Sequence, residues 1–560
     1  MNPITKKIVN TPVVKNRLFL YAKFWLDSLV NKQKLIFQGR YINRIAEKLD
    51  AGNNKKTILC PTLYFLDRGL AWQVTIAKAL ELRGHDVIFM PLDIHFPRKN
   101  ALYYDVYDGR YANDFFNLHT ETLLKSFNMN IKGYSQFGSA ANFKEYRKSV
   151  AKFSFSECKS FIYHDLPIGK MAFNSVMHFY RRGGTAFSDE EVEGYKDFLA
   201  IGMILYHTLS KVLDEIKTDV ILTINGSFLD SQIQMALAKS RGIRVVTFET
   251  GFMLNSIVLA INEPTTIWPM IKYLPKEYNT YQLTADQNKT LDDYLTQRSL
   301  GQNCVLDYWG KPVFDHKVIR KEIGLDPDIS PDVLFTNLQW DSTQIDCDIA
   351  FDSQVDWILE TIENYKNHPE RTLVIRVHPA EVTPIEIESK EKISDTIAKA
   401  YPQLPSNIFV IPAESKISSY PLTDVSNSVL VYASTTGLEA AIMGKTVLLA
   451  GKGHYRGQGF VQDVESKEQY FKLLDNLTSL TPSKETVNLA RKYAYFFFFE
   501  FMIPFNLVKE RTISDGGEMT AFNFKSESEL LPSKNSSLDF IIDLILDKTS
   551  YYERLKRLIK

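Results

Sequence analysis

Residues 429–459, reading VLVYASTTGLEAAIMGKTVLLAGKGHYRGQG, form the stretch that decides the fold. The short apolar run 429–433 has the length and bulk of a buried parallel strand. Small residues at 434–437 follow it, and a helical segment then runs to Gly444, a residue type that commonly ends helices. Another apolar run begins at Thr446. This order of strand, turn, helix and strand predicts a parallel sheet covered by helices.

The turn between the first strand and the helix is rich in hydroxyl groups, which come from Ser434, Thr435 and Thr436. Thr436 and Glu439 have the spacing of a capping box, in which each side chain accepts a backbone amide of the first helical turn. Free amides and the positive end of the helix dipole favour an anion at such a turn. We therefore expect a phosphate group to bind here. The plainer interpretation is that these residues only cap the helix.

Composition allows large hydrophobic cores and argues against nucleic acid as a partner. The chain has 560 residues, 45% of them hydrophobic, and its 66 Lys and Arg balance 66 Asp and Glu. This length predicts two domains with appendages, and the balanced charge indicates no nucleic-acid surface. The four cysteines show no CxxC or Cys/His spacing, so we expect neither a zinc site nor a disulfide framework. A reducing cytoplasm fits this pattern best.

Positive charge is concentrated in residues 1–56, which hold twelve Lys and Arg against three acidic residues. Aromatic and aliphatic residues gather at 18–29 within this arm. They predict a helix that either lies on an anionic membrane surface or packs on its own protein. We find no signal-peptide pattern and no run of the ~20 apolar residues that a spanning helix needs. The aromatic run 493–505 predicts a buried helix, with an interfacial role as the alternative.

Strands alternate with helices along most of the chain, which predicts an α/β fold with two Rossmann-like sheets. The expected strands of the first half are 57–62, 86–90, 220–224 and 244–248, and those of the second half are 333–336, 373–377, 408–411, 429–433 and 446–450. Residues 99–188 show no clear pattern. We expect four parts: a basic helical arm at 1–56, Rossmann-like domains at 57–300 and 301–482, and a helical tail at 483–560.

Polar side chains stand where three strands of the second half are expected to end. Asn337, His378 and Ser434 each follow an apolar run. Because ligands of open α/β sheets bind outside the carboxyl ends of the strands, these residues should line one site. A histidine there can donate to a phosphate or act as an acid for a leaving group. Alternatively, His378 bonds a loop carbonyl and takes no part in chemistry.

Two segments, IRVHPAE at 375–381 and DVSNSVLVYASTTGLEAAIMGKTVLLAGKGHYRGQGF at 424–460, resemble the donor-binding half of a GT-B glycosyltransferase. More narrowly, they are similar to bacterial capsule and surface polysaccharide biosynthesis proteins. That group includes Kdo transferases and shares HP and Ser/Thr motifs with bacterial sialyltransferases. FTNLQWDS at 335–342, NGSFLDSQ at 225–232 and FETGF at 248–252 also look like the group. The resemblance implies two Rossmann-like domains that face a cleft, and a nucleotide-sugar donor that is CMP- or UDP-linked.

The resemblance also implies roles for single residues. His378 resembles the HP histidine that contacts the donor phosphate, Ser434 and Thr435 resemble the hydroxyl pair at the same phosphate, and Glu439 resembles the acid that binds the donor ribose. Such enzymes usually stabilise the departing nucleotide with amides and side chains, so we expect no metal and no cofactor beyond the donor itself. From their places at strand ends and in the glycine-rich loop 451–459, the remaining expected donor contacts are Asn337, Thr436 and Arg456.

The first half of the chain should then hold the acceptor and a catalytic carboxylate. Glu249, at the expected strand end in FETGF, is our first choice as the general base of an inverting enzyme or the nucleophile of a retaining one. Asp67, after the first strand, is the second choice, and residues 225–230 also follow a strand. Each has the alternative of a helix cap or a surface ion pair.

Three functions are compatible with these residues. The leading one is a glycosyltransferase, cytoplasmic or peripheral on the cytoplasmic face of the inner membrane, that extends an oligosaccharide or glycolipid acceptor of a capsule or related surface glycan. An NDP-sugar 2-epimerase shares the two-domain fold and would need no acceptor. A non-catalytic sugar-nucleotide- or glycan-binding component of an assembly complex would bind donor without turnover. A glycerophosphotransferase that uses a CDP-linked donor is a further relative.

Overall fold

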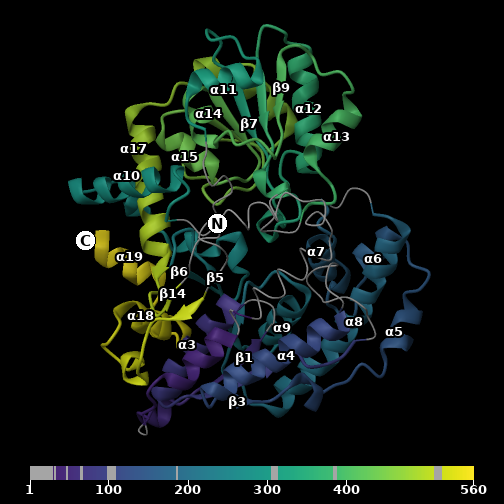
Figure 1. Cartoon of the computed structure of the whole chain (residues 1–560), viewed down its shortest axis with the longest axis vertical. Helices are drawn as coiled ribbons and strands as arrows, with labels where there is room; N and C mark the ends of the chain where they lie inside the picture. The colour runs from purple at the N-terminus through teal and green to yellow at the C-terminus, as the bar shows by residue number, and fades with distance from the viewer. Residues whose placement is uncertain are drawn as a thin grey trace, which may run out of the picture. The chain divides into compact units, whose positions relative to one another are not determined.

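The computed structural model describes residues 30, 33–45, 48–62, 67–96, 109–183, 187–303, 313–382, 388–509 and 520–559. The helix expected at 18–29 lies outside these residues. The chain divides into two compact units: unit 1 consists of residues 1–180, 186–272 and 502–554, and unit 2 of residues 181–185, 273–501 and 555–560. Each unit contains one large sheet accompanied by helices (Figure 1). The predicted α/β class with two parallel-rich sheets is confirmed.

The sheet of unit 1 has seven strands in the order β13-β6-β5-β4-β1-β2-β3. Their bounds are β1 (Thr57–Thr62), β2 (Asp86–Pro91), β3 (Asn130–Ile131), β4 (Val220–Ile224), β5 (Arg244–Thr250), β6 (Ser256–Ile261) and β13 (Ile503–Pro504). The four expected strands are its parallel centre. The short strand β3 extends that centre, and β6 and β13 add an antiparallel edge. Sequence reasoning missed β6 because it follows β5 after a short turn, without the helix that marks a parallel crossover. It missed β13 because that strand is only two residues long.

Helices fill the part of unit 1 where the sequence shows no pattern. The helices that begin in unit 1 are α3 (Asp67–Leu82), α4 (Gly109–Ser126), α5 (Phe143–Ser149), α6 (Phe155–Ser160), α7 (Ile168–Tyr180), α8 (Asp189–Glu215), α9 (Leu229–Ser240), α18 (Ser536–Ile545) and α19 (Tyr551–Ile559). α8 begins with a capping box between Ser188 and Glu191. Its buried face packs on α7 and α9 in one hydrophobic core. The helices α5 and α6 are too short to show a clear helical period in the sequence.

Residues from both ends of the sequence meet within unit 1. Residues 33–41 are helical, and Leu35 and Ile36 of this helix are buried. The amide of Asn43 donates to the carbonyl of Lys525 at 2.8 Å, and the amide of Glu527 donates back to Asn43 at 2.9 Å. Close in sequence to Lys525 and Glu527, β14 (Val508–Lys509) and β15 (Ala521–Phe522) pair as a two-stranded antiparallel sheet. The described part of the basic arm is therefore built into unit 1.

The sheet of unit 2 has six strands, all parallel, in the order β12-β11-β10-β7-β8-β9. Their bounds are β7 (Asp332–Phe335), β8 (Leu373–Arg376), β9 (Ile408–Ile411), β10 (Ser428–Val431), β11 (Thr446–Leu449) and β12 (Gln462–Asp463). The helices of this unit are α10 (Ala285–Ser299), α11 (His316–Ile323), α12 (Gln354–Lys366), α13 (Ile393–Ala400), α14 (Ser419–Val425), α15 (Thr436–Ile442), α16 (Lys467–Leu474) and α17 (Lys484–Tyr495). All five expected strands are present.

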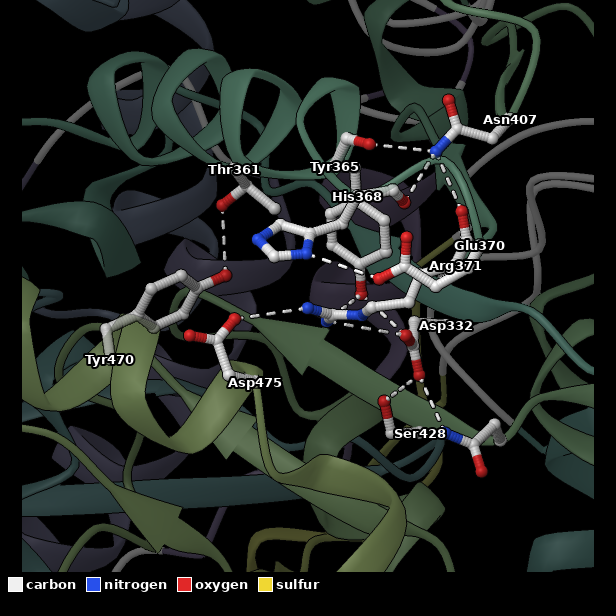
Figure 2. Close-up of polar contacts among 11 residues, drawn as sticks. Asp332, Thr361, Tyr365, His368, Glu370, Arg371, Asn407, Ser428, Tyr470 and Asp475 are labelled. Atoms are coloured by element: carbon white, nitrogen blue, oxygen red, sulfur yellow. Dashed lines mark hydrogen bonds and ion pairs between the residues drawn. The ribbon is translucent and has the colours of Figure 1, made fainter.

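A buried carboxylate joins elements at the amino end of this sheet (Figure 2). Asp332, the first residue of β7, accepts hydrogen bonds from the Tyr365 hydroxyl at 2.6 Å and the Ser428 hydroxyl at 2.5 Å. Arg371 lies 3.8 Å from the same carboxylate. Asn407 donates to the carbonyls of Tyr365 and Arg371 at 2.9 and 2.7 Å. These bonds link β7 and β10 to the connection between α12 and β8, which helps to hold the strands in register.

The aromatic run at 493–505 is buried within the described structure. α17 continues into a π-helical segment, Phe496–Phe501, in which Phe496, Phe497, Phe498 and Phe501 are buried. This confirms the interpretation as a buried helix for residues 493–501, whereas the end of the run forms strand β13 (Ile503–Pro504). Among the residues that the structure describes, no helix has both the length and the apolar character needed to cross a membrane.

Candidate functional site

The carboxyl ends of three neighbouring strands coincide in unit 2. In the sheet register, Val431 of β10 pairs with Phe335 of β7, and Phe335 pairs with Arg376 of β8. The residues that follow these positions therefore emerge at one edge, as the sequence predicts. They supply the hydroxyl and amide groups of Thr336 and Asn337, the imidazole of His378, and the hydroxyl-rich turn that begins at Ser434.

Side chains of the central strand connect the other two strand ends. The Thr336 hydroxyl accepts the backbone amide of His378 at 2.9 Å, and the side-chain carbonyl of Asn337 accepts the amide of Ala433 at 3.3 Å. The backbone of Asn337 is itself held by Gln354, through hydrogen bonds of 2.6 and 3.1 Å. The side-chain Nδ2 of Asn337 donates no hydrogen bond to any of the described residues. This group remains available as a donor to a ligand.

His378 is held as a neutral hydrogen-bond donor. Its Nδ1 accepts the backbone amide of Ala380 at 3.2 Å, which places the proton of the neutral ring on Nε2. Burial and the nearby Arg376 lower the pKa of His378 to about 4. At neutral pH the ring is uncharged and carries its single N–H group at Nε2. That geometry suits donation to a phosphate oxygen; the role as an acid for the leaving group stays a prediction.

The capping box expected between Thr436 and Glu439 is wrong. α15 begins one residue earlier than a Thr436 cap requires, and its N-cap, Thr435, has a helical backbone and makes no side-chain capping bond. The Ser434 hydroxyl instead accepts the amide of Thr436 at 3.2 Å and donates to the Thr436 hydroxyl at 3.0 Å. The structural reason is that Glu439 is engaged elsewhere.

Glu439 forms a buried ion pair with a residue from another helix. Arg298 of α10 donates from Nε to Oε1 of Glu439, and the two side chains are 18% and 8% exposed. Burial by itself would lower the pKa of Arg298, but the Glu439 carboxylate raises it well above its usual range. The carboxylate therefore has a fixed partner before any ribose binds. This partner could not be recognised from the sequence, because 141 residues separate the two positions.

The glycine-rich loop 451–459 covers the turn at Ser434. The hydroxyl of Tyr455, which is fully buried, donates to the Ser434 carbonyl at 2.7 Å. A Cβ atom on Gly437 would lie 2.0 Å from that hydroxyl, so the close approach requires glycine. Arg456 donates to the carbonyls of Gly451 and Val464 at 3.2 and 2.5 Å, and to Glu465. Its guanidinium braces the loop, and a donor contact for it stays a prediction.

Arg376 of the HP segment has a role that sequence reasoning missed. Its guanidinium is buried and donates to the backbone carbonyls of Val377, Pro412, Ser415 and Ile417 at 2.7–3.3 Å. It thus ties the residue before His378 to the loop that follows β9. The signal in the sequence is a single charged residue inside the apolar strand LVIRV, because buried arginines need several fixed acceptors.

Glu249 of unit 1 is oriented by its neighbours near the end of β5. Asn225 donates from Nδ2 to Oε2 of Glu249 at 2.9 Å, and the amide of Thr250 donates to Oε1 at 2.9 Å. Asp67 is the first residue of α3. Asp230, inside the predicted stretch 225–230, is only 6% exposed, and burial raises its pKa to about 6. In the described part of the chain, no group of three or more His, Cys, Asp or Glu side chains is placed to hold a metal ion.

Comparisons with known proteins connect unit 2 to one family. Residues 274–478 match the family model described as capsule polysaccharide biosynthesis protein. No curated protein matches the chain.

Solved structures give distant matches. Thermosulfurimonas dismutans KpsC, beta Kdo 2,4 transferase, is 16% identical with a TM-score of 0.32, over 49% of this chain and 79% of that one. The beta Kdo 2,7 transferase of the same KpsC is 14% identical with a TM-score of 0.30, over 65% and 90%. UDP-GlcNAc 2-epimerase from Neisseria meningitidis is 14% identical with a TM-score of 0.24, over 78% and 98%.

The family match covers all three strand ends of the candidate site, from Asn337 through His378 to Ser434. Through this region, the chain is similar to the capsule polysaccharide biosynthesis protein family.

Proposed function

We propose that this protein is a GT-B-type glycosyltransferase that transfers a sugar from a nucleotide-activated donor to a growing capsule or surface glycan. The observation that supports this most strongly is the register of three polar strand ends within the family-matched region. Ligands of open α/β sheets bind at such an edge. The proposed donor is CMP- or UDP-linked, and the proposed acceptor is an oligosaccharide or a glycolipid.

The donor phosphate is proposed to bind among fixed hydrogen-bond donors. These are Nε2 of His378, Nδ2 of Asn337 and the Thr435 hydroxyl, joined by the Ser434 hydroxyl once it turns from Thr436 to the phosphate. Negative charge grows on the phosphate as the sugar leaves, so donors that are already oriented stabilise the transition state more than the ground state. In this proposal the chemistry needs no metal ion. Glu439 binds the ribose while it keeps its bond to Arg298.

The acceptor hydroxyl is proposed to be deprotonated by Glu249. The hydrogen bonds from Asn225 and Thr250 fix the direction of its carboxylate, as a general base requires. Asp67 is the second candidate for this role.

A thermal-shift screen tests the donor site. A ligand that binds the folded protein raises its melting temperature, so CMP, UDP, GDP and CDP compounds are compared on the full chain. The informative variant is His378→Asn, because asparagine can still accept the Ala380 amide at the N-cap position but lacks the imidazole. The control is His368→Asn, which changes an exposed histidine at the amino end of the sheet. We expect the ligand-induced shift to fall in the first variant alone. If no nucleotide shifts the wild-type protein, the donor site is refuted.

Turnover separates the proposed function from its alternatives. Glu249→Gln should keep the nucleotide-induced shift and lose about 100-fold or more in turnover, as loss of a general base implies. Nucleotide release that depends on an added acceptor supports a transferase. Conversion of the nucleotide sugar without acceptor would instead indicate an epimerase, and binding without turnover a non-catalytic component. Wild-type turnover in Glu249→Gln would remove this residue from the mechanism.

Membrane association is proposed to come from the basic arm. Because residues 33–45 pack into unit 1, a deletion that reached them would also damage the fold. The test therefore deletes residues 1–29 only and compares flotation with anionic liposomes. Equal flotation of both forms would refute the proposal.

A further inference from the structure

Two histidines and three tyrosines form a cluster on unit 1, outside the proposed donor and acceptor residues. Its members are Tyr146 of α5, Tyr163 and His164 in the turn after α6, and Tyr206 and His207 of α8. Both α5 and α6 pack on α8, and all three helices are visible at one side of unit 1 in Figure 1. We call this group the His–Tyr cluster. It lies in the region whose sequence shows no regular pattern.

The rings of the His–Tyr cluster are arranged as two stacks at right angles. His164 stacks on Tyr206, with ring centres 4.9 Å apart and planes 3° from parallel. Tyr146 stacks on His207 at 6.1 Å and 12°. The two histidine rings meet edge to face at 5.6 Å, and the Tyr163 hydroxyl is 2.7 Å from Nε2 of His207. Such mutual contacts fix the orientation of all five rings.

His164 lies in a tight turn with a left-handed backbone. Tyr163 and Leu166 exchange backbone hydrogen bonds of 2.9 and 3.0 Å, which closes a turn with two central residues. Those residues, His164 and Asp165, have φ of +45° and +64°. Turns of this type favour asparagine and glycine, and histidine also adopts positive φ more readily than most residues. The stacking contact with Tyr206 then fixes the direction of the His164 ring in this turn.

The cluster is accessible to solvent. His164 and His207 are exposed, the three tyrosines are half-buried, and the neighbouring Ile162 is 64% exposed. Aromatic side chains that are partly exposed stand next to hydroxyl and ring nitrogen groups. A pyranose offers the matching surface, since its C–H faces pack on aromatic rings while its hydroxyls reach hydrogen-bonding groups at the edges.

Charge near the cluster argues against an ionic ligand. Arg147, which follows Tyr146, binds Asp197 at 2.8 Å and also pairs with Glu193. Lys196 donates to Glu193 at 2.6 Å. These four charges pair with one another, and the other charges that flank the cluster, Lys144, Glu145, Lys148 and Asp165, are of mixed sign. No strong field of one sign therefore attracts a nucleic acid or an anionic lipid. An uncharged or weakly charged polar ligand fits better.

We propose that the His–Tyr cluster is a saccharide-binding site that holds a segment of a glycan chain on unit 1. The identification of that glycan with the acceptor rests on the proposed function. The binding itself is independent of the donor site, because none of the five residues belongs to the donor or acceptor set. Retention of the chain at this site would keep the acceptor on the enzyme between successive transfers.

Affinity electrophoresis of the full chain tests the site, with gels that contain either neutral dextran or acidic polysialic acid. The main variant is His164→Asn, because asparagine suits a positive φ and only the ring is lost. Tyr206→Leu removes the stacking partner. The control is Tyr41→Leu, which changes a 70% exposed tyrosine of the helical arm. We expect at least one polysaccharide to retard the wild-type and Tyr41→Leu proteins, and the two cluster variants to bind it at least threefold more weakly.

The melting temperature of His164→Asn should stay close to that of the wild type, since asparagine is well suited to the positive φ of this exposed turn. Unretarded wild-type protein in both gels would overturn the proposal, as would cluster variants that migrate like the wild type. A third outcome would also overturn the proposal, in favour of a lipid contact: no glycan retards any form, the wild type floats with neutral liposomes, and the cluster variants do not. The nucleotide-induced thermal shift is measured on the same variants. If the nucleotide-induced shift is present but no glycan binds, only the saccharide-binding site is refuted. If a glycan binds but no nucleotide does, only the donor site is refuted.

Discussion

Arg298 and Glu439 form a buried ion pair between α10 and α15. Removal of one partner leaves the other charge buried and unpaired, which costs about 3–5 kcal/mol. We therefore expect Glu439→Ala to lower the stability of the protein by about this amount in urea unfolding.

The double variant Arg298→Met, Glu439→Leu provides the comparison. Because apolar side chains of similar size can replace a buried pair with little loss, it should be more stable than Glu439→Ala. If Glu439→Ala unfolded at the same urea concentration as the wild type, the ion pair would not be a buried one that stabilises the protein.

Two histidines should make the protein sensitive to acid. Burial lowers the pKa of His454 to about 3, and burial with Arg376 lowers that of His378 to about 4. In the unfolded chain both return to about 6.5. Above about pH 6.5 both histidines are neutral in the folded and the unfolded protein, so the stability is at its full value there. As the pH falls below it, the unfolded chain takes up protons that the folded protein does not. Stability should then decrease by up to about 1.4 kcal/mol per pH unit for each residue, until the folded pKa is reached.

Urea midpoints measured between about pH 7 and pH 4.5 test this dependence. His378→Asn should flatten the pH profile, whereas the exposed control His368→Asn should leave it as in the wild type. An unchanged profile in His378→Asn would show that this ring does not remain neutral.

Gly437 and Tyr455 should be energetically coupled. The added methyl of Gly437→Ala meets the Tyr455 hydroxyl, so we expect a loss of about 1–3 kcal/mol from overpacking. Tyr455→Phe removes the hydroxyl but leaves the ring, and should reduce the additional cost of the alanine. The measurement is a double-mutant cycle of urea midpoints together with nucleotide-induced thermal shifts. Additive effects would mean that the two groups do not meet.

Arg376→Lys should destabilise the protein strongly although it keeps the positive charge. A lysine ammonium has three donors and cannot match the geometry of four backbone carbonyls, so we expect a loss of about 2–3 kcal/mol. Nucleotide binding should weaken as well, because Arg376 ties the segment before His378 to the next loop. The control is Arg320→Lys, at a half-buried arginine that donates to only two carbonyls. Equal stability of the two variants would argue against the clamp.

Asp332→Ala tests the polar network at the opposite end of the same sheet. It leaves the hydroxyls of Tyr365 and Ser428 buried without their acceptor, and we expect a loss of about 3 kcal/mol. Asp475, which is 48% exposed and lies 3.4 Å from Arg371, provides the matched control. Its replacement by alanine should cost about 0.5 kcal/mol or less, as for most surface pairs. Similar losses would show that burial of Asp332 matters little.

The sequence predicted the parallel strands well because each is a continuous apolar run between turn residues. β1, β4 and β9 have the expected bounds, and the convergence of the strand ends followed from parallel topology alone. The partners of the site residues could not be predicted in the same way. Arg298 reaches Glu439 from a distant helix, and the acceptors of Arg376 are backbone carbonyls that leave no mark in the sequence. The prediction of a capping box at Thr436 was wrong for this reason, because the spacing of Thr436 and Glu439 does not reveal that Arg298 competes for Glu439.

Residues 99–188 were unpredictable for a different physical reason. Their helices are short, and their aromatic side chains pack on one another as well as on the core. Neither helical nor strand periodicity results from such packing.

The position of β13 has a consequence for synthesis of the protein. Its partner strand, β6, is translated about 240 residues earlier, and the segment 273–501 of unit 2 emerges from the ribosome in between. Unit 2 can therefore complete its sheet first, while unit 1 waits with an open antiparallel edge. Unpaired strand edges promote aggregation, so a nascent chain that stalls before residue 502 is the form of this protein most in need of a chaperone.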